Sequence, residues 1–400
     1  MTPSSMVGRT YLGLYETVRP LGEGNMGKVY LARRKSDGAP VVVKVMHDHL
    51  TSDPKFRELF EREMQFMARL KHPNIIELLD ASARDPKSLC IVMEYADGID
   101  LERLLKKHRR FPVDRVGRWV GQLCGALAAA HAHGVIHRDL KPANMMVVEP
   151  GTPKERIKVM DFGLAKLSGS VHISLDKLKG DGGTIATGTA EYMAPEQVRG
   201  DELDHRSDLY AVGVIMFELL TGRLPFSGAN IHALLQAHAE EPAPKFAEVG
   251  AGGVVSPAIE AVVQRCMLKF AVERFNNAWE LGQAFEKALG EKIMEGPAPP
   301  PPQKAAPPPA AKKKPHDPNA VVHELEAWMP ERIAVVKLKG YVDDMHGEVV
   351  ESVGGKIRVH FGQPNCKYQF PGAKATSKSS SGIGGWFGLG GGAPKTKGKL

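Results

Sequence analysis

Three polar residues stand close together in the stretch IHRDLKPANMMV, and their types suit proton and metal chemistry. Asp139 can accept or orient the proton of a hydroxyl group, Asn144 can offer a neutral oxygen to Mg²⁺, and Lys141 can balance charge on a phosphoryl group in transfer. In the same stretch, His137 is expected to be a packed core histidine. Arg138 is expected to be structural and able to receive a phosphate from a nearby loop. An ordinary polar loop is the alternative, so the choice depends on the rest of the chain.

A second stretch, LGEGNMGKVY, carries glycines at the spacing GxGxxG. Gly22, Gly24 and Gly27 would let backbone N–H groups approach phosphate oxygens, because no Cβ stands in the way. A dinucleotide-binding site needs a strand, a glycine turn and then a helix. A strand-like run that includes Val29 follows these glycines, which argues against NAD and favours a hairpin folded over nucleotide phosphates. An ordinary glycine-containing hairpin stays open as the alternative.

Lys44 lies inside the apolar run VVVKV, where a lysine is rarely buried without a partner. It could pair with the α- and β-phosphates of ATP, or its side chain could simply reach the surface from the strand. An acid on another element would favour the first interpretation. Glu63 is the candidate, whereas Glu58 and Glu61 are expected to face solvent.

Asp161 follows an apolar run and opens the tripeptide Asp161-Phe162-Gly163, 22 residues after Asp139. A carboxylate at that position can bridge Mg²⁺ to phosphates, Phe162 can pack, and Gly163 gives the backbone freedom. The tripeptide alone is common by chance. Its position after Asp139 makes it one member of an ordered set.

Three residues further along the chain are expected to hold this site together. Glu196 in GTAEYMAPEQ and Arg274 in MLKFAVERF could form a buried ion pair. Asp208 in SDLYAVGV could cap and brace the loop that carries Asp139. Each of these signals is weak when taken singly.

Hydrophobic periodicity predicts the elements that position these residues. Strands are expected at 11–21, 28–34, 39–46 and 88–95, and helices at 56–70, 115–133 and 207–221, the last ending at Gly222. The apolar face of the first helix consists of Phe56, Leu59, Phe60, Met64 and Met67. A small strand-rich part followed by a larger helical part predicts an α+β fold with two lobes.

Composition limits the class of protein. The formal net charge is +7, and five lysines without an acid lie from Lys374 onward, which does not by itself indicate nucleic-acid binding. The four cysteines are scattered without a CxxC pair, so neither a zinc site nor a disulfide framework is expected. No signal peptide and no run of about 18 apolar residues is found. We therefore expect a cytoplasmic protein without a transmembrane segment.

Changes in composition divide the chain into five parts. An N-terminal tail (1–10) precedes the main domain (11–289), and a linker rich in proline, alanine and lysine follows (290–318). A small β-rich module is expected at 319–371, with a hairpin of 348–353 and 356–361 around Gly354-Gly355. The Gly/Ser/Lys-rich remainder (372–400) is expected to be disordered.

The role of the module at 319–371 stays open. It could bind RNA, a peptide or an acidic membrane surface, and its lysines and aromatic residues would suit nucleic acid. Interspersed acids dilute the charge, so an interaction module with a protein partner is favoured over a nucleic-acid-binding unit.

Taken in order, these motifs strongly resemble those of the protein kinase superfamily, over about residues 11–289. Lys141, two residues after Asp139, resembles serine/threonine kinases, and GEGNMGKVYLARR resembles the bacterial (Hanks-type) branch. The matching motifs are the glycine-rich loop (Gly22, Gly24, Gly27, Val29), the strand Val41-Val42-Val43-Lys44, the loop His137-Arg138-Asp139-Leu140 with Asn144, and the activation-segment ends Asp161-Phe162-Gly163 and Ala194-Pro195-Glu196.

The resemblance implies a bilobal kinase fold and transfer of the γ-phosphoryl of ATP to protein serine or threonine, with Mg²⁺. It implies that Lys44 and Glu63 form the ion pair of the active state, and that Asn144 and Asp161 ligate the metal. The nucleotide-binding residues would also include Val42, Met93, which would line the adenine pocket, and Glu94 and Ala96, which would bond the adenine edge through the backbone.

The resemblance also implies control by phosphorylation. Thr184 or Thr187 is expected to be autophosphorylated, with Arg138 binding the phosphate and a transient homodimer as one route. A pseudokinase scaffold that binds ATP without turnover is the alternative. The intact Lys44 and Asp139 argue against it.

Overall fold

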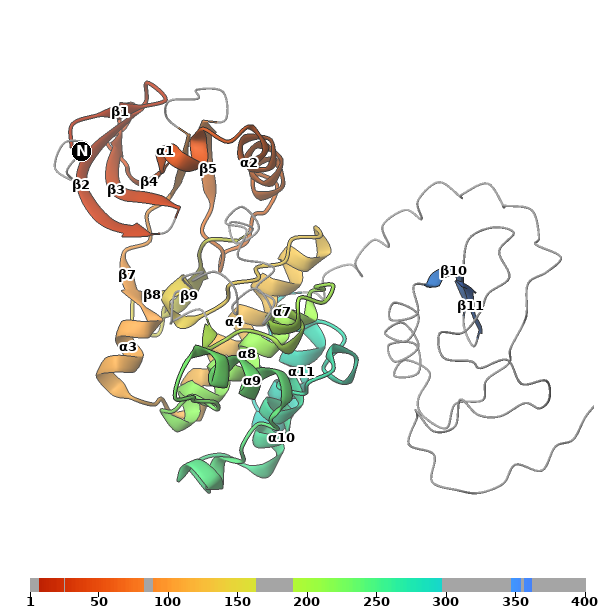
Figure 1. The fold of residues 1–400 in the computed structure, drawn as a ribbon. Helices are drawn as coiled ribbons and strands as arrows, with labels where there is room; N and C mark the ends of the chain where they lie inside the picture. Colours follow the sequence, from red (N-terminus) through yellow and green to blue (C-terminus); the bar gives the residue numbers. More distant parts are fainter. Residues whose placement is uncertain are drawn as a thin grey trace, which may run out of the picture. The chain divides into compact units, whose positions relative to one another are not determined.

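The N-terminal lobe is a curved antiparallel sheet with strand order β1-β2-β3-β4-β6-β5 (Figure 1). The computed structural model describes residues 7–24, 26–82, 89–162 and 190–296, and the backbone of 347–353 and 356–361. The strands of the lobe are β1 (Thr10–Tyr11), β2 (Tyr15–Gly24), β3 (Gly27–Arg34), β4 (Pro40–Met46), β5 (Leu78–Ser82) and β6 (Cys90–Glu94). The predicted strands are confirmed except at the first, because a turn at Leu12 and Gly13, both with positive φ, separates Tyr11 from β2.

Alternation along β4 places its side chains on two different surfaces. Val41 and Val43 are buried on one face of the sheet, in a cluster with Tyr30. Val42 and Lys44 occupy the opposite face, because successive strand residues point to opposite sides. That second face looks toward the other lobe and carries the side chains expected to meet a nucleotide.

Helix α2 (Pro54–Met67) packs against the sheet after the short helix α1 (Asp48–Thr51). Its N-terminus is capped by Asp53, whose side chain accepts from the Lys55 N–H. The buried side chains lie at the spacing expected of one helical face, and the helix ends three residues before the predicted end. These buried residues are Phe56, Phe60, Glu63 and Met64.

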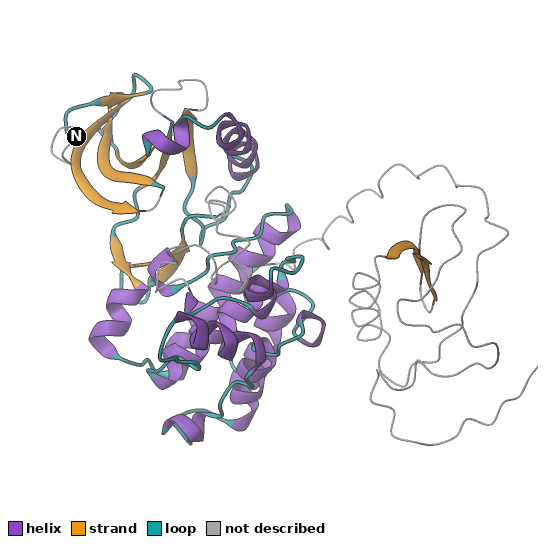
Figure 2. Ribbon diagram, in the orientation of Figure 1, coloured by secondary structure: helices purple, strands orange, loops and turns teal. Residues whose placement is uncertain are grey.

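The second lobe is helical, with a small three-stranded sheet β7-β8-β9 on the side of the first lobe (Figures 1 and 2). The predicted helices at 115–133 and 207–221 are confirmed as α4 and α8. The strands are β7 (Gly98–Asp100), β8 (Met145–Val148) and β9 (Arg156–Val159); the helices are α3 (Leu101–His108), α4 (Val113–Ala132), α7 (Pro195–Arg199), α8 (Arg206–Thr221), α9 (Ile231–Glu240), α10 (Pro257–Cys266) and α11 (Ala278–Leu289).

Helix α8 forms the centre of this lobe, because it is buried on nearly every side. Gly213 lets α10 approach closely, since a Cβ there would overlap Cys266. The helix ends at Gly222, which has a φ of 76° and caps it in the left-handed conformation. A helix fixed in this way is a rigid platform for the polar residues at its N-terminal end.

The C-terminal part of the chain is a separate compact unit, 317–400. Its described backbone is the antiparallel hairpin β10 (Gly347–Val353) and β11 (Lys356–Phe361), with a register irregularity between Val349 and Glu351. The hairpin prediction is confirmed. The rest of the predicted module lies outside the described residues.

The expected α+β fold with a β-rich first lobe and a helical second lobe is confirmed. Within the described ranges, we find no helix with both the length and the apolar character needed to cross a bilayer.

Candidate active site

The glycine-rich loop joins β2 to β3 as a hairpin, so strand follows strand as predicted. Added Cβ atoms at Gly22 and Gly24 would meet nothing within 4 Å, which leaves the backbone open to a ligand. Gly27 is different, because a Cβ there would overlap the carbonyl of Val45 on β4. The last glycine is therefore needed for strand packing, whereas the first two leave space.

Asp139, Lys141 and Asn144 come together in the loop between α4 and β8. Lys141 Nζ lies 3.1 and 2.9 Å from the two carboxylate oxygens of Asp139. Asn144 Nδ2 donates to the main-chain carbonyl of Asp139 at 2.7 Å and to its carboxylate at 3.3 Å. Because the amide nitrogen is used for these bonds, the Oδ1 atom of Asn144 is left as an oxygen donor for a cation.

Lys44 makes its ion pair with Asp161, within the residues that the structure describes. Nζ lies 3.0 Å from each carboxylate oxygen. The expected ion pair of Lys44 with Glu63 stays a prediction, and Glu63 is buried on α2. Asp161 has a left-handed backbone with a φ of 60°, rare for a residue other than glycine, and reaches Lys44 from the second lobe. Both of its carboxylate oxygens accept from the Lys44 ammonium group.

Asp208, at the start of α8, braces the loop that carries Asp139, as expected. This loop, residues 137–144, is called the catalytic loop below. Its two carboxylate oxygens accept from the backbone N–H groups of His137 and Arg138, both at 2.9 Å. His131 Nε2 lies 2.8 Å from the same carboxylate. Burial alone would raise the pKa of Asp208, but the hydrogen bond and charge of His131, together with these partners, lower the pKa below its usual value. The carboxylate therefore stays ionised and holds Arg138 at its strained φ of 68°.

His137 is a packed core residue, as predicted. It has no exposed surface, and its Nε2 lies 2.8 Å from the carbonyl oxygen of Met160. Its ring meets the Phe162 ring edge to face, with centroids 4.7 Å apart. The catalytic loop and the segment that carries Asp161 are thereby joined through buried side chains.

The predicted buried ion pair of Glu196 and Arg274 is confirmed. Arg274 Nη1 and Nη2 lie 2.7 and 2.8 Å from the two carboxylate oxygens. Next to Glu196, the Gln197 amide donates to the Arg138 carbonyl at 2.8 Å. The end of the activation segment is thus attached both to the core of the lobe and to the catalytic loop.

The connection between the lobes is reinforced by an ion pair that the sequence did not suggest. Lys158 Nζ on β9 lies 2.7 and 2.8 Å from the carboxylate oxygens of Glu94, at the end of β6. The backbone N–H of Glu94 donates to the Glu77 carbonyl at 2.9 Å. These two contacts fix Glu94, which is expected to meet adenine. Ala96 follows two residues later and Val42 pairs with Met93 across the sheet, and both are half-buried.

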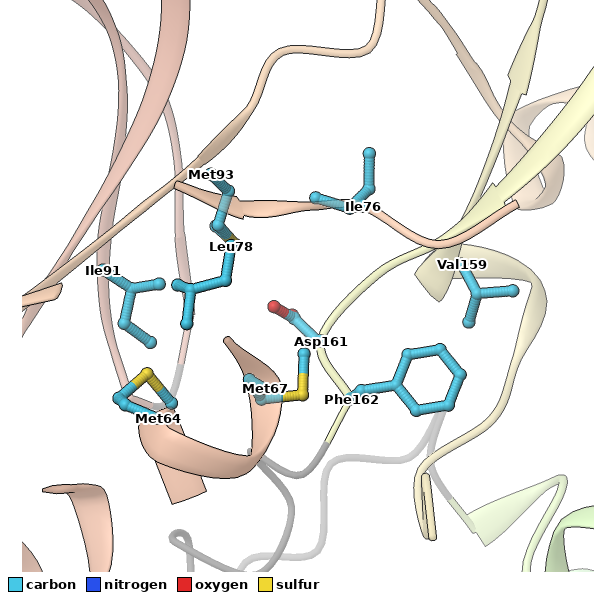
Figure 3. A pocket seen from close by; sticks show the side chains of 9 residues that line it. All are labelled: Met64, Met67, Ile76, Leu78, Ile91, Met93, Val159, Asp161 and Phe162. Carbon is cyan, nitrogen blue, oxygen red and sulfur yellow. The ribbon is translucent and has the colours of Figure 1, made fainter. Parts of the chain in front are cut away.

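A pocket lies at the inner end of this region, between α2, the sheet and the segment that carries Asp161. Met93 lines it, together with residues from both lobes (Figure 3). Figure 3 shows the Asp161 side chain and the Phe162 ring leaving the chain on different sides. The pocket-lining residues are Met64, Met67, Ile76, Leu78, Ile91, Met93, Val159, Asp161 and Phe162.

Oxygen donors suitable for Mg²⁺ are Asn144 Oδ1 and the Asp161 carboxylate. Mg²⁺ is usually held by one or two carboxylates and by substrate phosphates, so a small protein donor set fits it. No group of three His, Cys, Asp or Glu residues that could hold a metal ion occurs among the described residues.

Some expected residues lie outside the described ranges, and some observed ones were missed. Gly163 and the candidate phosphorylation sites Thr184 and Thr187 lie outside the described residues. Lys158 and His131 were not expected from the sequence. Lys158 is 64 residues from its partner in the chain, so no local pattern could have revealed the contact.

Comparisons with known proteins agree with this geometry. Residues 15–280 match the family model for the protein kinase domain. Serine/threonine-protein kinase pkn3 of Myxococcus xanthus is 41% identical over 274 residues, which cover 67% of this chain and 48% of that protein. Serine/threonine-protein kinase PknB of Mycobacterium tuberculosis is 36% identical over 284 residues, 70% of this chain and 43% of that protein. The match thus spans about half or less of these relatives.

Among solved structures, the kinase domain of Mycobacterium tuberculosis PknI superposes with a TM-score of 0.54 at 29% sequence identity. The alignment covers 71% of this chain and 98% of that structure.

Proposed function

The chain belongs to the protein kinase domain family, and we propose that it is an ATP-dependent serine/threonine kinase that phosphorylates protein hydroxyl groups. The observation that carries the proposal is the meeting of Asp139, Lys141 and Asn144 on one loop, with Asp161 paired to Lys44 beside it. These are the side chains that phosphoryl transfer requires, held by buried partners.

In the proposed reaction, Asp139 orients the serine or threonine hydroxyl and accepts its proton. The hydroxyl oxygen bonds to the γ-phosphorus as the bond to the β-phosphate oxygen breaks, and ADP leaves. Lys141, bonded to Asp139, balances negative charge on the group in transfer. Asn144 and Asp161 would hold Mg²⁺ together with ATP, and the ion would neutralise phosphate charge.

The nucleotide would lie between the glycine-rich loop and the connection between the lobes. Gly22 and Gly24 leave the backbone open to phosphates, and Lys44 reaches into the same region. Adenine would contact the backbone of Glu94 and Ala96, with Val29, Val42 and Met93 around it as its lining.

Phosphoryl transfer from labelled ATP·Mg²⁺ to the protein itself and to a generic basic protein tests the proposal. Asp139→Asn and Lys44→Met should each lower incorporation by about 100-fold or more. Asp114→Asn and Lys35→Met are matched controls at exposed positions and should retain activity. Tight ATP binding by the wild type without any transfer would contradict an enzyme and favour a pseudokinase scaffold.

We propose further that Thr184 or Thr187 is autophosphorylated and that Arg138 receives the phosphate. Arg138 is braced by Asp208 and Gln197 through its backbone, so its position does not depend on its guanidinium. Mass spectrometry of active protein should find phosphate on one of the two threonines; both unmodified would refute the idea. If a transient homodimer performs the step, its rate should rise with protein concentration.

The C-terminal module (319–371) is proposed to bind a protein partner, after the linker at 290–318. The alternative, RNA binding, predicts affinity that falls steeply with salt. Titration of the full chain with RNA at two salt concentrations distinguishes the two. A cytoplasmic location also stays a proposal, which fractionation of cells would test.

A further inference from the structure

The tip of the glycine-rich loop is attached to the residue that follows β4. His47 Nε2 lies 2.9 Å from the carbonyl oxygen of Gly24, and the His47 backbone N–H donates to the carbonyl of Met26 at 3.0 Å. One residue therefore contacts both described residues at the tip, one through its side chain and one through its backbone.

The Met26 side chain adds a third attachment. It is 8% exposed and belongs to a buried cluster with Phe56 and Phe60 of α2. The tip is therefore held both by the apolar packing of Met26 and by the hydrogen bonds to His47. Gly22 and Gly24 remain open on the surface expected to meet phosphates.

The His47 side chain does not cap the helix that it precedes. His47 is the N-cap of α1, yet its side chain makes no capping bond; its main-chain carbonyl accepts from Leu50 and Thr51 instead. To bond a carbonyl, Nε2 must carry a hydrogen, which both the neutral Nε2–H tautomer and the imidazolium provide. The Glu23 carboxylate lies 3.9 Å from the same nitrogen.

We propose that His47 is a positioning residue for ATP, which holds the glycine-rich loop in the conformation that covers the phosphates. A glycine-containing loop loses much conformational entropy when it closes on a ligand. A loop that is already held loses less, so its affinity for nucleotide is higher. The role rests on the proposed kinase activity, because the loop is taken to bind ATP.

His47→Ala and His47→Gln test the proposal, with His49→Ala as the matched control. His49 stacks on His47 with ring centroids 5.6 Å apart but is exposed. Losing one hydrogen bond of ordinary strength should weaken ATP·Mg²⁺ binding by about three- to tenfold. The KM for ATP should rise by a similar factor, while the KM for the protein substrate stays unchanged. Glutamine can donate to the Gly24 carbonyl and should restore most of the affinity.

Calorimetric titration with ATP·Mg²⁺ gives the affinity directly, since KM equals Kd only when chemistry is slow. Hydrogen exchange of the loop peptide should quicken in His47→Ala, with the melting temperature unchanged. Equal ATP affinity in His47→Ala and wild type, or an equal loss in His49→Ala, would overturn the proposal. A wild type that binds ATP without transferring phosphate would instead refute the kinase activity and leave the binding comparison valid.

Discussion

Breaking the ion pair between Glu196 and Arg274 should destabilise the second lobe severely. The Arg274 side chain has no exposed surface, and besides Glu196 it bonds the carbonyls of Leu268 at 2.8 Å and Arg206 at 3.0 Å. Arg274→Met removes all of these bonds and leaves the Glu196 carboxylate, 7% exposed, with the Ser207 hydroxyl. Removing one partner of a buried pair costs about 3–5 kcal/mol, because the remaining charge is uncompensated.

Thermal unfolding followed by circular dichroism measures the effect. At about 2–4 °C per kcal/mol for a domain of this size, the melting temperature should fall by about 10 °C. Arg199→Met is the matched control, because the ion pair of Arg199 with Asp201 is exposed on both sides and contributes at most about 1 kcal/mol. A fall no larger in Arg274→Met than in Arg199→Met would refute the reasoning.

The same pair gives a pH dependence of known sign. Burial would raise the pKa of Glu196, but the hydrogen bonds and charge of Arg274, with the Ser207 hydroxyl, lower it below its usual value. The folded state thus binds this proton less readily than the unfolded state. The contribution is present above the unfolded pKa of about 4.3 and is lost as the pH falls through the folded pKa. Glu196→Gln should therefore flatten the decline of melting temperature below about pH 4.5; parallel curves would contradict this.

Three further changes should affect the site separately. Lys158→Met should raise the KM for ATP more than it lowers kcat, because Glu94 loses the partner that fixes it. If Glu94→Gln raises the KM equally and the double variant raises it no further, the two residues act as one unit. Gly27→Ala should weaken both ATP binding and stability, since its Cβ would overlap the Val45 carbonyl, and urea unfolding would report the latter. Asp208→Asn should lower kcat by about tenfold or more while ATP affinity is retained, because the catalytic loop loses a charge-assisted brace; single-turnover kinetics with unchanged rates would contradict it.

Sequence motifs predicted most of the residues of the site, but not always which side chains form ion pairs with one another. The pairing of Glu196 with Arg274 was predictable because a fully buried arginine needs a carboxylate. The ion pair of Lys44 with Asp161 was not predicted, because the two residues lie 117 positions apart in the chain. The φ of 60° at Asp161 was not predictable either, because a backbone angle at one residue leaves no trace in periodicity.

Contacts between distant segments were the second class that sequence reasoning missed. Lys158 and Glu94 lie on strands of different lobes, and His47 bonds a main-chain carbonyl, which every residue has. Such contacts depend on the final arrangement of elements. Helix positions, in contrast, followed from local periodicity within two or three residues at each end.

The attachment of the chain after α2 to β9 determines how that helix can move. The main-chain carbonyl of Asn74 accepts from the Val159 N–H at 2.8 Å, and the Ile76 N–H donates to the Val159 carbonyl at 2.9 Å. Between them, the Ile75 side chain lies in the core of the second lobe. The segment that follows α2 is therefore attached to the second lobe, and a rotation of the helix would have its pivot near the C-terminal end. A swing of about 10° about it would move the N-terminal end of this helix, about 20 Å away, by about 3 to 4 Å, but Glu63 by only about 1 Å. Such a rotation would change the packing around Met26 far more than the position of Glu63.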